Sequence, residues 1–167
     1  DQRAATLTAL QQERVYGDAL SLDETAFSVL DLDGDRFLPN GELIDAVDLV
    51  SAGGVDQDTT ANAGSYLDNI AITGQNGTGG FDASNYDLSY VANNLVVNQR
   101  AVTVTALQQE RIYGDQLTLD ETAFGVLDLD GDATLPNGEV IDTVDLVSAG
   151  GVDQDTTASA GSYVDNI

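Results

Sequence analysis

The chain has 167 residues, of which 29 are acidic and 5 are basic, and its formal charge at pH 7 is −24. This charge repels nucleic acid and anionic membranes, which excludes proteins that bind either, and it suits cations or a salty medium. The sequence has no cysteine and no histidine, which excludes disulfides and thiol sites. Its hydrophobic fraction of 42% is enough for a core, which excludes a disordered chain, and no apolar run is long enough for membrane insertion.

An alternating pattern begins the chain. Residues 3–10, RAATLTAL, alternate with period two and contain threonine, as strands do. We therefore expect a β-strand here.

An acidic segment follows at residues 31–42, DLDGDRFLPNGE, with carboxylates at positions 1, 3, 5 and 12 of a twelve-residue window. This is the spacing of an EF-hand calcium loop. An EF-hand itself is excluded, because position 6 is not glycine and the flanks resemble strands. We expect an acidic loop on a β scaffold that binds calcium, and the alternative is a solvated acidic turn. The expected ligands are Asp31, Asp33, Asp35 and Glu42.

The next segments also indicate strands. Residues 42–51, ELIDAVDLVS, hold apolar residues on both alternating faces, and a helix from residues 39–40 is the competing prediction. Residues 65–74, SYLDNIAITG, predict another strand, and the glycine-rich residues 73–80 are the most flexible-looking part of the chain. We interpret Asp56 and Asp58 as a solvated turn, because two carboxylates alone lack the ligands that calcium needs.

The segment YDLSYVANNLVVN, residues 86–98, predicts a strand that folds at residues 92–94 into a hairpin. Tyr86 and Tyr90 share the parity of Leu88, so we expect both rings in the core rather than in a sugar-binding site.

The sequence then repeats itself with an offset of 97. Residues 1–70 and 98–167 share 57 identities in 70 positions, and residues 71–97 have no second copy. We expect an excerpt of a longer tandem array, with a first module at 1–97 and an incomplete second module at 98–167. The second acidic loop would bind calcium through Asp128, Asp130, Asp132 and Glu139. Only residues 98–100 separate the strand patterns of the two copies, which predicts a stiff rod.

Short strands separated by turn signals predict an all-β fold of tandem β-sandwich modules of the Ig-like kind, with β-grasp-like modules as the alternative.

Several pieces together resemble the YDG/MBG-type tandem repeats of large bacterial extracellular adhesins. These pieces are TALQQERVYGD, LPNGELIDAVDLVSAGG, AGSYLDNIAITG and SNYDLSYVANNLVVN, and they span nearly the whole period. The resemblance implies a non-catalytic module that is secreted or exposed on the cell surface. It implies no ligand residues, and the DLDGD insertion departs from the pattern.

Two functions follow as hypotheses. The first is a rigid, calcium-stabilised stalk of a surface adhesin or extracellular matrix fibre, whose partners are neighbouring repeat modules of the same chain. The second is an adhesive module that binds carbohydrate, such as extracellular polysaccharide, or other copies of the protein. An enzyme is not expected, because carboxylates are the only remaining catalytic chemistry and they recur along the chain.

Overall fold

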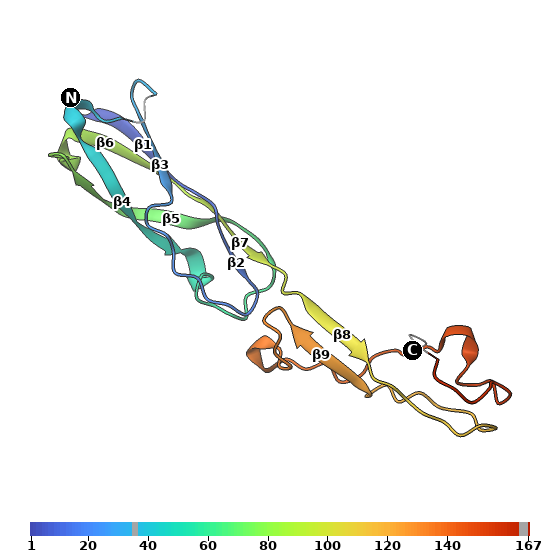
Figure 1. Cartoon of the computed structure of the whole chain (residues 1–167). Helices are drawn as coiled ribbons and strands as arrows, with labels where there is room; N and C mark the ends of the chain where they lie inside the picture. The colour runs from blue at the N-terminus through green and yellow to red at the C-terminus, as the bar shows by residue number, and fades with distance from the viewer. Residues whose placement is uncertain (35–36, 164–166) are drawn as a thin grey trace. The chain divides into compact units, whose positions relative to one another are not determined.

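The computed structural model describes residues 1–34, 37–163 and 167, and the described part of the chain is all-β (Figure 1). The chain divides into two compact units, Asp1–Gln99 and Arg100–Ile167. Apart from the strands, the only regular elements in the described residues are short 3-10 helices. None of these helices approaches the length and apolarity that a membrane-spanning helix needs. The expectation of an all-β chain is therefore confirmed.

The first unit contains two sheets. One sheet has the strand order β3-β1-β6, and the other has the order β2-β7-β5-β4. The strands are β1 (Arg3–Ala9), β2 (Gln12–Val15), β3 (Phe27–Asp31), β4 (Leu43–Ser51), β5 (Gly64–Thr78), β6 (Tyr86–Val91) and β7 (Asn93–Asn98). The strand prediction for residues 42–51 is confirmed, and the competing helix is wrong.

Two of the chain's crossings between the sheets, from β1 to β2 and from β6 to β7, run side by side. β1 is parallel to β6 in the three-stranded sheet, and β2 is parallel to β7 in the four-stranded sheet (Figure 1). The predicted hairpin at residues 92–94 is therefore wrong, because β6 and β7 belong to different sheets. Asn93 fixes the crossing, since its side-chain amide donates to the carbonyl oxygen of Ala9 at 2.9 Å.

The core lies between the sheets. Leu7 and Ala9 of the first sheet form one buried cluster with residues of the second sheet, among them Val47, Ile70 and Leu95. All five of these residues are 0% exposed. Alternation along β1 directs Leu7 and Ala9 inward, whereas Thr6 and Thr8 between and beside them are partly exposed.

The glycine-rich segment 73–80, which looks flexible in the sequence, belongs largely to β5, which continues to Thr78. Here glycine serves close packing. A Cβ on Gly77 would lie 2.5 Å from both the Leu43 carbonyl oxygen and the Phe81 ring. Only a residue without a side chain fits at this position.

The described residues of the second unit form one pair of strands, β8 (Val102–Ala106) and β9 (Phe124–Asp128). Among its described residues none is fully buried. The counterparts of β2 and β4, residues 109–112 and 140–148, are not strands, although their sequences are nearly those of the first unit. The reason is a missing partner. β2 pairs only with β7, and β4 pairs with residues 70–78 of β5. Among these partner residues, only Ile70 has an equivalent within residues 98–167, namely Ile167.

Because the two copies differ in burial, the same substitution at equivalent positions should destabilise the first unit more than the second. Val47 is 0% exposed, whereas its counterpart Val144 is only partly buried. We expect Val47→Ala to lower the free energy of unfolding of the first unit by about 1–3 kcal/mol, because it removes buried methyl groups and leaves a cavity. Val144→Ala should lower the free energy of unfolding of the second unit by less than about 0.5 kcal/mol. Urea denaturation followed by circular dichroism measures both, and equal losses would contradict this account of the core.

Candidate functional site

The first acidic loop, residues 31–42, joins two strands that lie in different sheets. Asp31 is the last residue of β3, and Glu42 precedes β4. Between them, the turn Pro39–Gly41 (η1) places Asn40 at a φ of 60°, a left-handed conformation that asparagine tolerates better than most residues. Asp35 lies outside the described residues. The loop therefore connects the edge strand β3 of one sheet with the edge strand β4 of the other.

An arginine of β1 holds the two aspartates at the start of this loop. The Nη2 atom of Arg3 lies 2.5 Å from Asp31 Oδ2 and 2.5 Å from Asp33 Oδ2, and its Nε donates to Asp31 Oδ2 at 3.1 Å. Strand register explains both contacts. Because Ala5 pairs with Asp31 in the antiparallel ladder, Arg3 reaches Asp31 diagonally and lies opposite the position of Asp33. The hydrogen bonds to both carboxylates raise the pKa of the Arg3 guanidinium.

The second acidic loop, residues 128–139, repeats this contact. Arg100 Nη2 lies 2.9 Å from Asp128 Oδ2, and Arg100 also forms an ion pair with Asp130. The other oxygen of Asp128, Oδ1, accepts the backbone N–H groups of Asp130 and Asp132 at 2.9 and 3.0 Å. Burial raises the pKa of Asp128, but hydrogen bonds from the Asp132 amide, the Arg100 side chain and the Asp130 amide outweigh it. The net pKa is lowered.

Glu42 has a different partner from the aspartates. Its Oε2 accepts the Tyr86 hydroxyl at 2.6 Å, and the Tyr86 ring stacks on Phe81 with 5.5 Å between centroids. Burial, and then the hydrogen bond to Glu42, raise the pKa of Tyr86 to about 12. Tyr86 lies in the core as expected, but the prediction for Tyr90 is wrong, since Tyr90 is 43% exposed.

Of the aspartates Asp56 and Asp58, Asp58 caps a turn. Asp58 Oδ1 accepts the backbone N–H of Thr60 at 3.0 Å and its hydroxyl at 2.6 Å. The same pattern of an aspartate and a hydroxyl residue two positions later recurs at Asp23, Asp82, Asp120 and Asp155. Hydrogen bonds from the hydroxyl and the backbone N–H lower the pKa of each of these aspartates.

A second arginine, Arg14 of β2, binds the loop that contains this turn. Its side chain is buried and donates to the carbonyl oxygens of Asp58 at 2.5 Å and Asp18 at 2.8 Å. Arg111 makes the equivalent contacts in the second unit, to Asp155 and Asp115, each at 2.7 Å. These arginines fix backbone rather than neutralise carboxylates.

The predicted calcium ligands divide into two groups. The first two aspartates of each loop contact one guanidinium, whereas Glu42 binds Tyr86. In the part of the chain that the structure describes, no three acidic side chains gather where they could bind a metal ion. This finding does not test calcium binding, because Asp35, one of the predicted ligands, lies outside the described residues. Calcium binding therefore stays a prediction from the spacing.

Sequence reasoning did not find Arg3, Arg100 or the role of Tyr86. A signal for the arginines was present, since each precedes its two aspartates by 28 and 30 residues in both copies. The meaning of that spacing depends on the pairing of β1 with β3, which the repeat alone does not reveal.

Comparison with models of protein families, with curated proteins and with solved structures finds no match to this chain. The resemblance to YDG/MBG-type repeats therefore stays a prediction from the residues.

The hydrogen bonds at these turns lead to a prediction: removal of the threonine hydroxyl should raise the pKa of the aspartate that accepts from it. The pKa of Asp58 lies below the ordinary value of 3.8. A group with a lowered folded pKa contributes stability above its unfolded pKa, and this contribution is lost as the pH falls through the folded value. We expect Thr60→Val to raise the pKa of Asp58 towards 3.8 and to make the first unit less sensitive to acid below about pH 4.

A titration of the carboxyl carbons by nuclear magnetic resonance measures this pKa. Thr157→Val is the matched variant, because it should raise the pKa of Asp155 and leave Asp58 unchanged. An ordinary pKa for Asp58 in the unmodified chain would contradict the assignment.

Proposed function

We propose that the chain consists of tandem β-sandwich modules that act as a structural spacer, a stalk, in an extracellular adhesin or matrix fibre. The two sheets of the first unit and the buried cluster that both contribute support the sandwich. The 97-residue repeat supports a tandem array. In this proposal each module acts as a spacer, and repetition of the module sets the length of the stalk.

The observation that carries this proposal is the joint between the copies. The carbonyl oxygen of Asn98 accepts the backbone N–H of Tyr16 at 2.9 Å within the first unit. Two residues later, Arg100 is bound to Asp128 and Asp130 within the second unit. Because only Gln99 lies between these two anchored residues, the joint has few free dihedral angles. A joint of this kind favours a stiff spacer over independent binding modules on a flexible linker.

The charge supports an extracellular or salty setting as part of the same proposal. A charge of −24 keeps neighbouring copies apart and is tolerated best where ions screen it. Catalysis forms no part of the proposal, because the acidic side chains recur along the chain in both copies of the repeat.

Calcium stabilisation is a separate part of the proposal, and only the spacing of the acidic loops supports it. Two carboxylates about 5 Å apart repel each other by roughly 3 kcal/mol at an effective dielectric constant near 20, so each loop needs a cation. Arg3 and Arg100 supply one positive charge each. Calcium would have to displace the guanidinium to reach the same oxygens, so the two cations compete.

The stalk is tested by the length of longer arrays. Proteins with two, four and eight copies of the 97-residue period, studied by small-angle X-ray scattering, should show a maximum dimension that rises in proportion to the number of copies. A flexible chain of modules would instead grow roughly as the square root of that number. Insertion of a Gly-Ser linker after Gln99 is the control and should restore the weaker growth. Square-root growth of the unmodified arrays would contradict the stalk.

The competition between calcium and arginine is tested by thermal melting. At about 10 mM calcium and a dissociation constant of about 1 mM, binding adds roughly 1.4 kcal/mol to the free energy of unfolding. We expect a rise in melting temperature that a chelator reverses. The rise should be larger in Arg100→Gln, in which no guanidinium competes, and smaller in Asp128→Asn. The absence of any shift in both the unmodified chain and Arg100→Gln would remove calcium from the proposal and leave the stalk unaffected.

A further inference from the structure

The first and the last strands of the first unit run side by side and in the same direction (Figure 1). β1 is parallel to β6 over six paired positions, which begin at Arg3 and Tyr86. β2 is parallel to β7 over four paired positions, which end at Val15 and Asn98. We call these two pairings the terminal ladders. They join the beginning of the module to its end along most of its length.

Further hydrogen bonds connect the same two segments outside the ladders. Gln2 Nε2 donates to the carbonyl oxygen of Ser84 at 3.0 Å, before β1 and β6 begin. Asn93 connects the segments at the crossing between the sheets. At the far end, the backbone N–H of Tyr16 donates to the carbonyl oxygen of Asn98 at 2.9 Å. The two segments are therefore bonded at the start, in the middle and at the end of the module.

The direction of the terminal ladders determines how a pulling force acts on them. The chain enters the first unit beside the start of β1 and leaves it at the end of β7, and these two points lie at opposite ends of the unit (Figure 1). Tension between them pulls β1 and β2 backwards along their own direction and pulls β6 and β7 forwards. Because the hydrogen bonds of a parallel ladder are evenly spaced along the strands, tension loads all of them together in shear.

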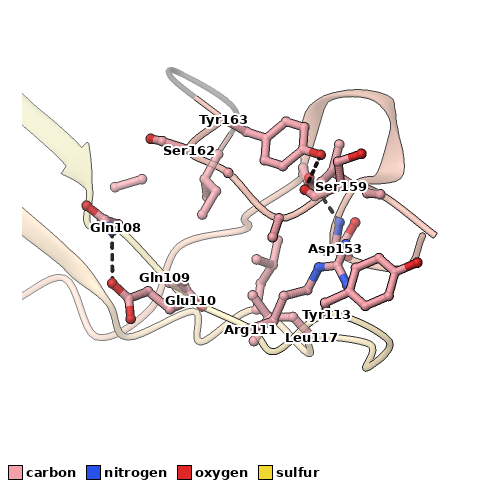
Figure 2. Close-up of a pocket in the computed structure, with 18 of the residues that line it drawn as sticks. Gln108, Gln109, Glu110, Arg111, Tyr113, Leu117, Asp153, Ser159, Ser162 and Tyr163 are labelled. Carbon is pink, nitrogen blue, oxygen red and sulfur yellow. Dashed lines mark hydrogen bonds between the residues drawn. The ribbon is translucent and has the colours of Figure 1, made fainter. Parts of the chain in front are cut away.

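The connection from β2 to the rest of its sheet runs through β7. Residues 109–112 have nearly the sequence of β2 but are not a strand, and Gln109 and Arg111 line an open groove instead (Figure 2). The local sequence therefore does not form this strand by itself. In the first unit β2 is the edge strand of its sheet, and β7 is its neighbour there. Tension on β2 must therefore break the β2–β7 ladder before β2 can leave the sheet.

We propose that the terminal ladders act as a mechanical clamp, which keeps the module folded when the chain is pulled at its two ends. Resistance to tension is a function beyond that of a spacer. The inference rests on the proposed tandem array in one respect, since force reaches a module through its neighbours. The clamp depends on direction, because the same hydrogen bonds resist strongly when they are sheared and weakly when they are separated from one end.

Single-molecule force spectroscopy on the full chain tests the clamp through the choice of attachment points. The chain has no cysteine, so a pair of introduced cysteines gives two unique attachment points. Asp1→Cys combined with Gln99→Cys loads the terminal ladders in shear. Ala19→Cys combined with Gln99→Cys is the matched control, because it separates β2 and β7 from the end at which both strands stop. All three substituted residues are exposed, so both variants should keep the fold.

At equal pulling speed, the unfolding force should be about two to four times higher for the pair at positions 1 and 99 than for the pair at positions 19 and 99. The four paired positions of the β2–β7 ladder share the load in the first geometry, whereas they break in turn in the second. Urea denaturation without force should give both variants the same free energy of unfolding, because the direction of pulling affects only the barrier to forced unfolding. Equal unfolding forces in the two geometries, or a lower force in shear, would overturn the clamp.

The clamp and the stalk can fail separately. Equal forces in the two geometries, together with arrays whose length rises in proportion to the number of copies, would leave a stiff spacer without a clamp. A higher force in shear, together with square-root growth of the arrays, would support the clamp and contradict the stalk.

Discussion

The pairing of β7 with β2 and β5 is the interaction on which the rest of the first unit depends. β7 is an inner strand that uses both of its edges, and Leu95 and Val97 are among the largest fully buried side chains. Residues 98–167 have nearly the sequence of residues 1–70 and include no counterpart of β7, and the described counterpart of β2, residues 109–112, is not a strand. Because backbone polar groups must be paired when they are buried, a strand cannot become part of a core without its neighbour. The two copies thus form a comparison in which local sequence is held constant and the long-range partner is removed.

Local ion pairs and hydrogen-bonded turns, rather than one binding site, stabilise the many ionised aspartates. Arg3 and Arg100 each bind two aspartates at the end of a strand, where like charges would otherwise repel across a tight turn. Hydroxyl side chains and backbone N–H groups stabilise the ionised form of five other aspartates, which include Asp58. Aspartate suits this use because its short side chain reaches the backbone two residues on. The acidic composition therefore also fixes turns.

The parts of the fold that follow from local side-chain patterns could be predicted, and the parts that follow from register could not. The alternation in residues 3–9 and 43–51 indicated β1 and β4, because a strand needs only a period of two. The hairpin prediction was wrong because nothing in residues 86–98 shows that Asn93 binds Ala9, 84 residues away. The contact of Arg3 with Asp31 and Asp33 likewise depends on the antiparallel register of β1 and β3. At the acidic loop, the spacing alone predicted a metal site, whereas the neighbouring strand brings an arginine to the same oxygens.

The joint between the copies and the completeness of a module are linked through β7. β7 ends at Asn98, whose carbonyl oxygen accepts the backbone N–H of Tyr16, and Arg100 forms ion pairs with Asp128 and Asp130 of the second acidic loop. Three residues, 99–101, separate the strand that completes the first unit from β8, the first strand of the second unit. In the proposed stalk, force on the chain would act along β7, which hydrogen bonds hold on both edges. A strand anchored in this way must lose both sets of bonds before it moves, so the element that completes the core is also the one suited to transmit load.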